Sequence, residues 1–243
     1  MQKFFASSQN ITDEKIIISE KEQVHHIKDV LRLKLKEKVK ISDNKGNEYL
    51  TEITGLLPEK IILTIKERLI TQEQKMKLTV ACAIPKQAKI DDIIDKLTQL
   101  GVDRIIPMLT QRVIVKIDKA KSKERLLRLQ KIALSAAQQS KRRTLPLIDP
   151  LKNIKEVFLE SKDFDLKLIP ALFSQRKTLK EILSGKTPKN ILALIGPEGD
   201  FTDEEMQMAL KSGFVPVTLG ELVLRVDTAA VTVASFIKLY ADD

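Results

Sequence analysis

With 243 residues, of which 43% are hydrophobic and 31% charged, and a net charge of +9, the chain has the composition of a globular protein that buries its own core. No apolar run reaches the roughly 18 residues that a membrane helix requires. The opening segment MQKFFASSQN has no signal-peptide stretch, so we expect a cytoplasmic protein that makes no membrane contact. A single cysteine, Cys82, excludes an internal disulfide framework and is expected to be a buried, inert thiol.

Residues 1–70 are expected to form a small β-rich domain, in which strand-like segments cover 15–20, 37–44, 47–55 and 60–69. A short helix is predicted over 22–33, and Asn44 to Asn47 supply the turn residues of one hairpin. His25 and His26 are the two histidines of the chain and point in different directions on that helix, which excludes a multi-histidine metal site.

From residue 74 to the end, strands alternate with helices. Predicted strands cover 77–85, 102–109, 112–117, 165–172, 190–196 and 214–220. Predicted helices cover 89–101, about 121–139, the residues that follow Thr202, and 228–240. Near-continuous apolar runs such as ILALI are typical of a parallel sheet covered on both faces, so we predict an α/β fold for this part of the chain.

The positive charge is confined to the middle of the chain. Residues 76–150 carry a net charge of +9, whereas residues 1–75 carry +2 and residues 151–243 carry −2. Ten of these basic residues lie between Lys116 and Arg143, where only Asp118 and Glu124 oppose them. Such a cluster can attract a polyanion by counterion release, although a solvated face of a lysine-rich helix has the same composition. We favour nucleic acid as the partner.

Two glycine-bearing loops follow apolar strands near the carboxyl end. In IGPEGDFTDEE, a strand ends at Ile195, and Thr202 with Glu205 forms a capping box that starts a helix. In VTLGELVLRVDTAA, the next helix is expected to be capped by Asp227 or Thr228. The phosphate-binding patterns GxGxxG and GxxxxGK[ST] are absent, and the acidic residues favour a cationic or neutral ligand. The residues alone leave ordinary turns and ligand loops equally open.

Five segments in order resemble a known family. They are HHIKDVLRLKLKEKVKISDNKGNEY, KIDDIIDKLTQLGVDRIIPMLTQRVIV, KIALSAAQQSKRRTLP, LALIGPEGDFTDEE and LRVDTAA, the last preceded by LG at 219–220. The chain is similar to the bacterial 16S ribosomal RNA uridine-N3 methyltransferases, the RsmE family of the SPOUT superfamily. The resemblance implies a PUA-like, RNA-docking β-barrel over 1–70 and a SPOUT domain over 74–243 whose trefoil knot covers about 191–243.

The resemblance also implies the function and its residues. S-adenosylmethionine is expected to be the methyl donor, N3 of a uridine in 16S rRNA of the small ribosomal subunit the acceptor, and the protein a homodimer that uses no metal. The cofactor would be surrounded by Leu194, Ile195, Gly196, Pro197, Glu198, Gly199, Leu219, Gly220, Leu224 and Thr228. Catalytic roles fall to Arg225, Asp227 and Arg142. RNA would be contacted by Arg112, Lys116, Lys121, Arg125, Arg128, Gln139, Ser140, Arg142 and Arg143.

The chain departs from the family pattern at several positions. Asp200 stands where the family has a second glycine, Leu222 replaces an arginine, and Asp227 replaces a glutamate. Asp200 and Asp227 lie in the expected cofactor loops, so these departures bear on cofactor affinity. We expect an active enzyme. The alternatives are a catalytically silent RNA-binding ribosome assembly factor of the same fold, or a methyltransferase that acts on a different RNA base.

Overall fold

The computed structural model describes residues 1–69, 76–85, 90–112, 119–172 and 176–242, with the side chains of 119–121 and 242 left out of that description. The chain divides into two compact units. The first comprises Met1–Glu73 together with Ala137–Leu145, and the second comprises Gln74–Ala136 together with Pro146–Asp243. The long helix α3 (Lys119–Gln139) therefore begins in the second unit and ends in the first.

The first unit is built on a five-stranded sheet in the order β1-β3-β4-β5-β2. Its strands are β1 (Lys3–Phe5), β2 (Lys15–Ile18), β3 (Lys38–Ser42), β4 (Glu48–Leu56) and β5 (Ile61–Leu69). Between β2 and β3 lie the helix α1 (Lys21–His25) and a π-helical turn (His26–Val30). Among the described strand pairs of this first sheet, β1 and β3 run parallel and the others run antiparallel. The inward side chains, such as Phe4, Ile41 and Ile53, form the apolar core of this unit.

The second unit contains an eight-stranded parallel sheet. Its order is β11-β13-β10-β12-β6-β7-β8, with β9 also paired to β7. The strands are β6 (Lys77–Ala83), β7 (Arg104–Leu109), β8 (Leu147–Ile148), β9 (Lys152–Asn153), β10 (Leu166–Pro170), β11 (Lys177–Thr178), β12 (Asn190–Ile195) and β13 (Val215–Thr218). Its central pair, β6 and β12, is fully buried except at the residues that begin each strand.

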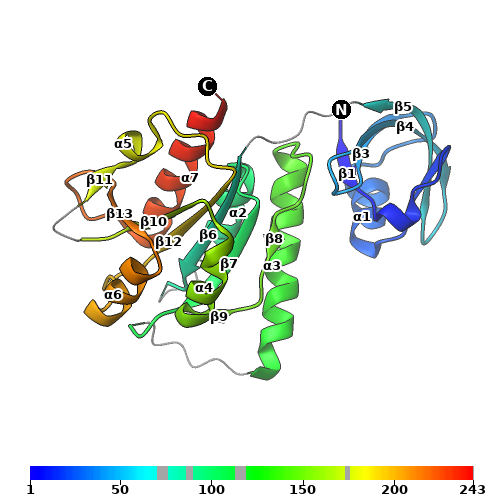
Figure 1. Ribbon diagram of the computed structural model, residues 1–243. Coiled ribbons are helices and arrows are strands. Elements are labelled where there is room, and N and C mark those ends of the chain that lie inside the picture. Colours follow the sequence, from blue (N-terminus) through cyan, green and yellow to red (C-terminus); the bar gives the residue numbers. More distant parts are fainter. Residues whose placement is uncertain (70–75, 86–89, 113–118, 173–175, 243) are drawn as a thin grey trace. The chain divides into compact units, whose positions relative to one another are not determined.

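Helices cover both faces of this sheet (Figure 1). On one face, α2 (Ile90–Gln99), α3, α5 (Leu179–Leu183) and α7 (Val226–Asp242) pack on the alternate side chains that include Val80 and Ala193. On the other face, α4 (Ile154–Glu160) and α6 (Asp203–Lys211) pack on the set that includes Ala81 and Leu194. This arrangement, with the small β unit, confirms the predicted fold class. The trefoil knot stays a prediction.

Capping boxes fix where three helices of the second unit begin. The predicted box of α6 is present, since Thr202 accepts from the backbone N–H of Glu205 and the Glu205 carboxylate accepts from that of Thr202. The helices α4 and α5 were missed in the sequence but begin with the same device, built from Asn153 with Glu156 and from Thr178 with Glu181. A search for the spacing of a capping box would have found both.

Two predicted features, the strand over 112–117 and the cap of the last helix, have different outcomes. The strand predicted over 112–117 lies almost entirely outside the described residues, because these omit 113–118. The expected cap of the last helix is wrong, because α7 begins at Val226 and Asp227 therefore lies inside its first turn. A carboxylate there still interacts favourably with the positive end of the helix dipole.

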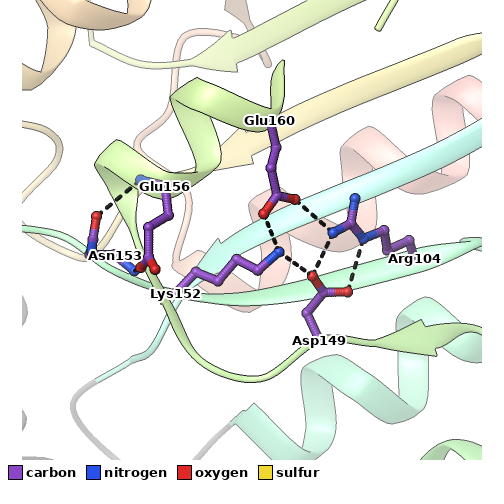
Figure 2. A network of polar contacts seen from close by, with 6 residues as sticks. All are labelled: Arg104, Asp149, Lys152, Asn153, Glu156 and Glu160. Carbon is purple, nitrogen blue, oxygen red and sulfur yellow. Dashed lines mark hydrogen bonds and ion pairs between the residues drawn. The ribbon is translucent and has the colours of Figure 1, made fainter. Parts of the chain in front are cut away.

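A network of four charged side chains ties α4 to the edge of the sheet (Figure 2). Arg104 donates two hydrogen bonds to Asp149, at 2.9 and 2.6 Å, and one to Glu160 at 2.7 Å. Lys152 pairs with Asp149 at 2.6 Å and also bonds to Glu160. Burial acts to raise the pKa of Asp149, but the hydrogen bonds from Arg104 and Lys152 outweigh it and lower that pKa. The bond from Lys152 lowers the pKa of Glu160 as well.

We expect this network to make the second unit sensitive to acid. A carboxyl group whose pKa is lowered by folding contributes stability above its unfolded pKa, and that stability is lost as the pH falls through the folded pKa. The loss should therefore begin near the ordinary carboxyl pKa of about 4 and grow below it. Melting temperatures measured from pH 6 to pH 3 should fall less steeply for Asp149→Asn than for the wild type. The exposed Asp163→Asn serves as control, and parallel curves for all three proteins would contradict the prediction.

Candidate cofactor site

A hollow opens at the carboxyl edge of the parallel sheet, where open α/β sheets bind ligands. Three segments that are far apart in the sequence line it. They are residues 170–172 with Arg176 at and after the end of β10, residues 195–198 with Asp200 at and after the end of β12, and, at and after β13, Val217, Leu219, Gly220, residues 222–224, Val226 and Ala229. The enclosed part measures about 90 Å³, and Leu222 and Val223 stand at its rim with 80% and 71% of their surface exposed. Exposed apolar side chains beside a hollow are typical of a binding site.

The loop after β12 is a tight turn that packs directly against the buried ring of Phe201. The backbone N–H of Asp200 donates to the carbonyl of Pro197 at 3.0 Å, which closes the turn. At Gly196 a Cβ atom would lie 2.9 Å from Cε2 of Phe201, whose ring is buried in the core. Gly199 is less confined, since a Cβ there would be 3.4 Å from Cδ of Arg112. Gly196 is thus required by packing, at the point where the loop meets the hollow.

Asp200 has the backbone conformation that explains the glycine of the family pattern. Its φ is +60°, in the left-handed region, which Asp tolerates better than most residues. One carboxylate oxygen accepts from the N–H of Phe201 at 2.8 Å, and the other accepts from the N–H of Leu172 at 2.9 Å. A glycine could not make these bonds. The substitution therefore ties the segment after β10 to the loop after β12, and both line the hollow.

The segment after β7 is also fixed to this loop. Arg112 donates to the carbonyl oxygen of Gly199. The backbone N–H of Gln111 donates to the buried carboxylate of Glu205 at 2.8 Å, and its side-chain amide lies 3.3 Å from Glu204. Arg112 was predicted to face RNA. Its guanidinium reaches the predicted cofactor loop while the residue as a whole stays exposed, and its contact with RNA stays a prediction.

Two carboxylates near the hollow act on the buried thiol of Cys82 in β6. Burial raises the pKa of the Cys82 thiol to about 12, and the carboxylates of Asp227 and Glu198 add to that shift. Cys82 is therefore protonated and inert, as its apolar surroundings predicted. Glu198 lies in the lining of the hollow, and Asp227 lies in the first turn of α7, next to the lining residue Val226. Such a site favours a cationic ligand over a phosphate.

The structure brings seven of the ten predicted cofactor residues together around the hollow: Ile195, Gly196, Pro197, Glu198, Leu219, Gly220 and Leu224. The other three do not line it. The side chain of Leu194 points to the opposite face of the sheet because side chains alternate along a strand. Gly199 backs onto Arg112, and Thr228 is exposed on α7. Sequence reasoning missed the segment 170–172 and Arg176, which carry no motif.

The predicted catalytic residues fall in both units. Arg225 directly precedes α7 and Asp227 lies in its first turn, both next to lining residues of the hollow. The exposed Arg225 side chain forms no ion pair with the described residues. Arg142 belongs to the first unit, so its relation to the hollow is not described. The catalytic assignments stay predictions.

The predicted RNA-binding residues are spread more widely. Arg125 and Arg128 project from α3, where Arg128 pairs with Asp91 at 3.0 Å. Gln139, Ser140 and Arg143 lie at the end of α3 and just after it, in the first unit. Lys116 lies outside the described residues, and the side chain of Lys121 is not described. None of these contacts with RNA is tested by the structure.

The chain matches two family models. Residues 72–238 match the RNA methyltransferase domain, and residues 18–66 match the RNA methyltransferase PUA domain. A ribosomal RNA small subunit methyltransferase E of Synechocystis is 31% identical over 85% of this chain and 67% of its own length. The chain belongs to the ribosomal RNA small subunit methyltransferase E family. The protein of that name from Rickettsia conorii is 29% identical over 98% of this chain and 95% of its own.

Solved structures of this methyltransferase family show the same fold. The small subunit methyltransferase E of Neisseria gonorrhoeae, bound to S-adenosylmethionine, has a TM-score of 0.86 and 27% identity, over 99% of this chain and 98% of its own. A protein of Legionella pneumophila in complex with the same cofactor has a TM-score of 0.87 and 27% identity, over 98% and 97% of the two chains. Within the part described here, no helix is both long and apolar enough to cross a membrane.

We expect the two hydrogen bonds of Asp200 to matter more for cofactor binding than the strain at its backbone. Asp200→Gly relieves the left-handed conformation but frees Leu172, and it should weaken S-adenosylmethionine binding about threefold to tenfold, in line with the loss of one to two hydrogen bonds. Asp200→Ala loses both bonds and keeps the strain, so it should bind more weakly still. Calorimetric titration measures each affinity.

Asp200→Asn is the matched control for this series, because its amide oxygen can still accept one of the two bonds. It should bind the cofactor more tightly than Asp200→Gly does. If Asp200→Gly binds as tightly as the wild type, the tie to Leu172 has no role in the site.

Proposed function

We propose that this chain transfers the methyl group of S-adenosylmethionine to N3 of a uridine in 16S rRNA of the small ribosomal subunit, in the decoding region at the position conventionally numbered 1498. The observation that carries the proposal is the convergence of two glycine-bearing loops around one hollow, which Glu198 lines and next to which Asp227 lies in the first turn of α7. The proposal is also supported by relatives named for small subunit RNA methylation and by related structures solved with S-adenosylmethionine.

The residues of the hollow fit this cofactor. Leu219, Leu224 and Val226 offer an apolar wall to an adenine ring. Asp227 and Glu198 supply the negative charge that a sulfonium favours. Arg176 at the lining can pair with a carboxylate, which the methionine end of the cofactor carries. When bound, S-adenosylmethionine supplies an electrophilic methyl group, and the chain itself has to provide position and charge.

Two roles remain for side chains near the hollow. The N3 proton of uracil must leave before or as the new N–C bond forms, and an anion develops on the base. Arg225 can stabilise that anion, because its charge is fixed and exposed beside the hollow. Asp227 or Glu198, or a water molecule, can accept the proton. No metal is needed for this displacement, and positioning of the two reactants contributes most of the rate.

The net charge supports RNA as the partner, and the resemblance to the superfamily supports a homodimer. An RNA substrate fits the net charge of +9 in residues 76–150. The homodimer and the knot over about 191–243 belong to this proposal as properties of the superfamily that the chain resembles. Light scattering after size-exclusion chromatography would measure the mass of the assembly, which should be twice 27.5 kDa.

Base-resolved mass spectrometry of ribosomal RNA tests the proposal directly. RNA from a strain without this gene should carry an unmethylated uridine at the target, and the wild-type gene should restore the methyl group. Purified protein should also transfer a labelled methyl group to small subunits from the deletion strain. If RNA from the deletion strain lacks a methyl group on another base and keeps it on the proposed uridine, that other base is the target.

Calorimetry with S-adenosylmethionine separates the enzyme from a silent assembly factor. The enzyme should release heat on binding, with one cofactor per hollow. Absence of binding, together with normal methylation in the deletion strain, would identify a silent RNA-binding protein of the same fold.

A further inference from the structure

On the face of the first unit's sheet that points away from its apolar core, the charged side chain of Lys3 is buried. Along β1 and β3, Phe4 and Ile41 point into the apolar core, so Lys3, Lys40 and Ser42 lie on the opposite face. Lys3 and Lys40 are direct neighbours across the parallel pair. Lys3 is nevertheless only 5% exposed. Something must cover this face, and the cover is the segment 137–145, which belongs to the same unit.

Three side chains of the sheet and its turn hold that segment by its backbone. Lys3 donates to the carbonyl of Lys141 at 3.3 Å and pairs with the buried carboxylate of Glu48. The hydroxyl of Ser42 donates to the carbonyl of Arg143. The side-chain oxygen of Asn44 accepts from the N–H of Leu145. In addition, the amide of Gln138 lies 3.3 Å from the Gln23 side chain, which bonds the backbone of Phe5.

The end of α3 takes a defined shape beneath these contacts. The N–H of Arg142 donates to the carbonyl of Ala137 at 2.9 Å, and that of Lys141 donates to Gln138 at 3.2 Å, which is the Schellman pattern. Lys141 occupies the left-handed position with a φ of +56°, where glycine is the usual residue.

The surface that results is basic. Lys141 and Arg143 are exposed, and Lys40 is half-buried beside them. Glu48, the carboxylate in contact with this group, is already paired with Lys3 and lies 3.4 Å from Nε of Arg143. Lys3 pairs with Lys40 across the two strands, and Glu48 contacts both Lys3 and Arg143, so the three cations lie close together. Burial lowers the pKa of Lys3, and the charges of Arg143 and Lys40 act in the same direction. Concentrated positive charge on a rigid backbone suits phosphate groups.

We propose that Lys40, Lys141 and Arg143 form a docking surface for RNA backbone phosphates, and that Ser42 positions this surface by holding the backbone of Arg143. This inference rests on the proposed function, because it takes ribosomal RNA as the partner. The proposal gives the sheet of the first unit a function, which is to hold the basic segment 137–145 in shape although that segment is distant in sequence. It also adds Lys40 and Lys141 to the residues expected to contact RNA.

The test measures binding of fluorescently labelled small ribosomal subunits from the deletion strain at several salt concentrations. Lys40→Ala and Arg143→Ala should each weaken binding about threefold to tenfold, and each should lower the slope of log affinity against log salt by about 1. S-adenosylmethionine affinity should stay unchanged in both. The control Lys60→Ala removes an exposed lysine at the opposite end of β4, in the turn before β5, and should bind as the wild type does.

A double-mutant cycle tests the positioning role of Ser42. Ser42→Ala should weaken binding by itself, but it should add nothing when Arg143→Ala is already present, because the two act through one contact. Additive losses would mean that Ser42 only stabilises the unit and would overturn its positioning role. Melting temperatures show whether each variant is folded.

Other outcomes overturn either this surface or the proposed substrate, and they can be told apart. Lys40→Ala and Arg143→Ala variants that bind like Lys60→Ala would reject the surface. Weaker binding with an unchanged salt slope would point to a protein of the subunit and would reject it too. If the wild type ignores small subunits but binds a generic RNA duplex, and Arg143→Ala weakens that binding, the surface stands and the proposed substrate falls.

Discussion

Gly196→Ala is expected to weaken S-adenosylmethionine binding at least about tenfold, which corresponds to about 1.4 kcal/mol. The added methyl group would lie 2.9 Å from Cε2 and 3.2 Å from Cδ2 of Phe201, closer than real contacts allow. Phe201 is buried among the apolar side chains between the sheet and the helices α4 and α6, and it has no room to withdraw. The loop must therefore shift into the hollow that it lines. Overpacking of this kind costs about 1–3 kcal/mol of stability as well.

Gly199→Ala is the matched control in the same loop. Its methyl group would be 3.4 Å from Cδ of Arg112, a flexible and exposed side chain. The melting temperature of Gly199→Ala should therefore stay close to that of the wild type, while that of Gly196→Ala falls by several degrees. Calorimetry and thermal unfolding measure both variants. Equal behaviour of the two would show that the contact with Phe201 does not constrain the loop.

Arg225→Ala is expected to lower the rate of methyl transfer about 100-fold or more while cofactor affinity changes little. Loss of one electrostatic group that acts only in the transition state typically costs about two to three orders of magnitude in turnover. Arg225 is exposed at the start of α7, beside the hollow rather than beneath it, so it is suited to meet the RNA base. Single-turnover rates with saturating small subunits, measured beside calorimetric affinities, separate the two effects.

Arg225→Lys is the companion variant, because it keeps the charge but not the shape of the guanidinium. It should recover part of the lost rate if charge is what matters. Equal losses of rate and of cofactor affinity in Arg225→Ala would reject a role in the transition state and would make Arg225 a binding residue. The proton acceptor can be sought in the same way with Asp227→Asn and Glu198→Gln.

Local sequence patterns were enough to predict most of the elements. A capping box depends on two residues three positions apart, so Thr202 and Glu205 were enough to predict the start of α6. Gly101, with a φ of +84°, ends α2 as its position after an amphipathic segment indicated. The loops that line the hollow could be located in the same way, because each follows an apolar strand and contains a glycine.

Contacts between distant segments could not be predicted in this way. The tie from Asp200 to Leu172 spans 28 positions, and that from Ser42 to Arg143 spans 101. Neither pair has a periodicity or a spacing that would reveal it. The start of α7 was misjudged for a related reason, since Asp227 and Thr228 both suit a cap and only the path of the chain selects Val226 as the first helical residue.

The residue pattern alone predicted most of the strands and helices in their order along the chain, the glycine-bearing loops, the uneven charge and the family to which the chain belongs. These depend on residue types and on neighbours within a few positions. The tertiary fold places β10 between β13 and β12, so that the loops after these three strands meet around one hollow, and it folds residues 137–145 onto the first unit. Strand order and long-range packing minimise the free energy of the whole chain, and no local segment encodes that minimum.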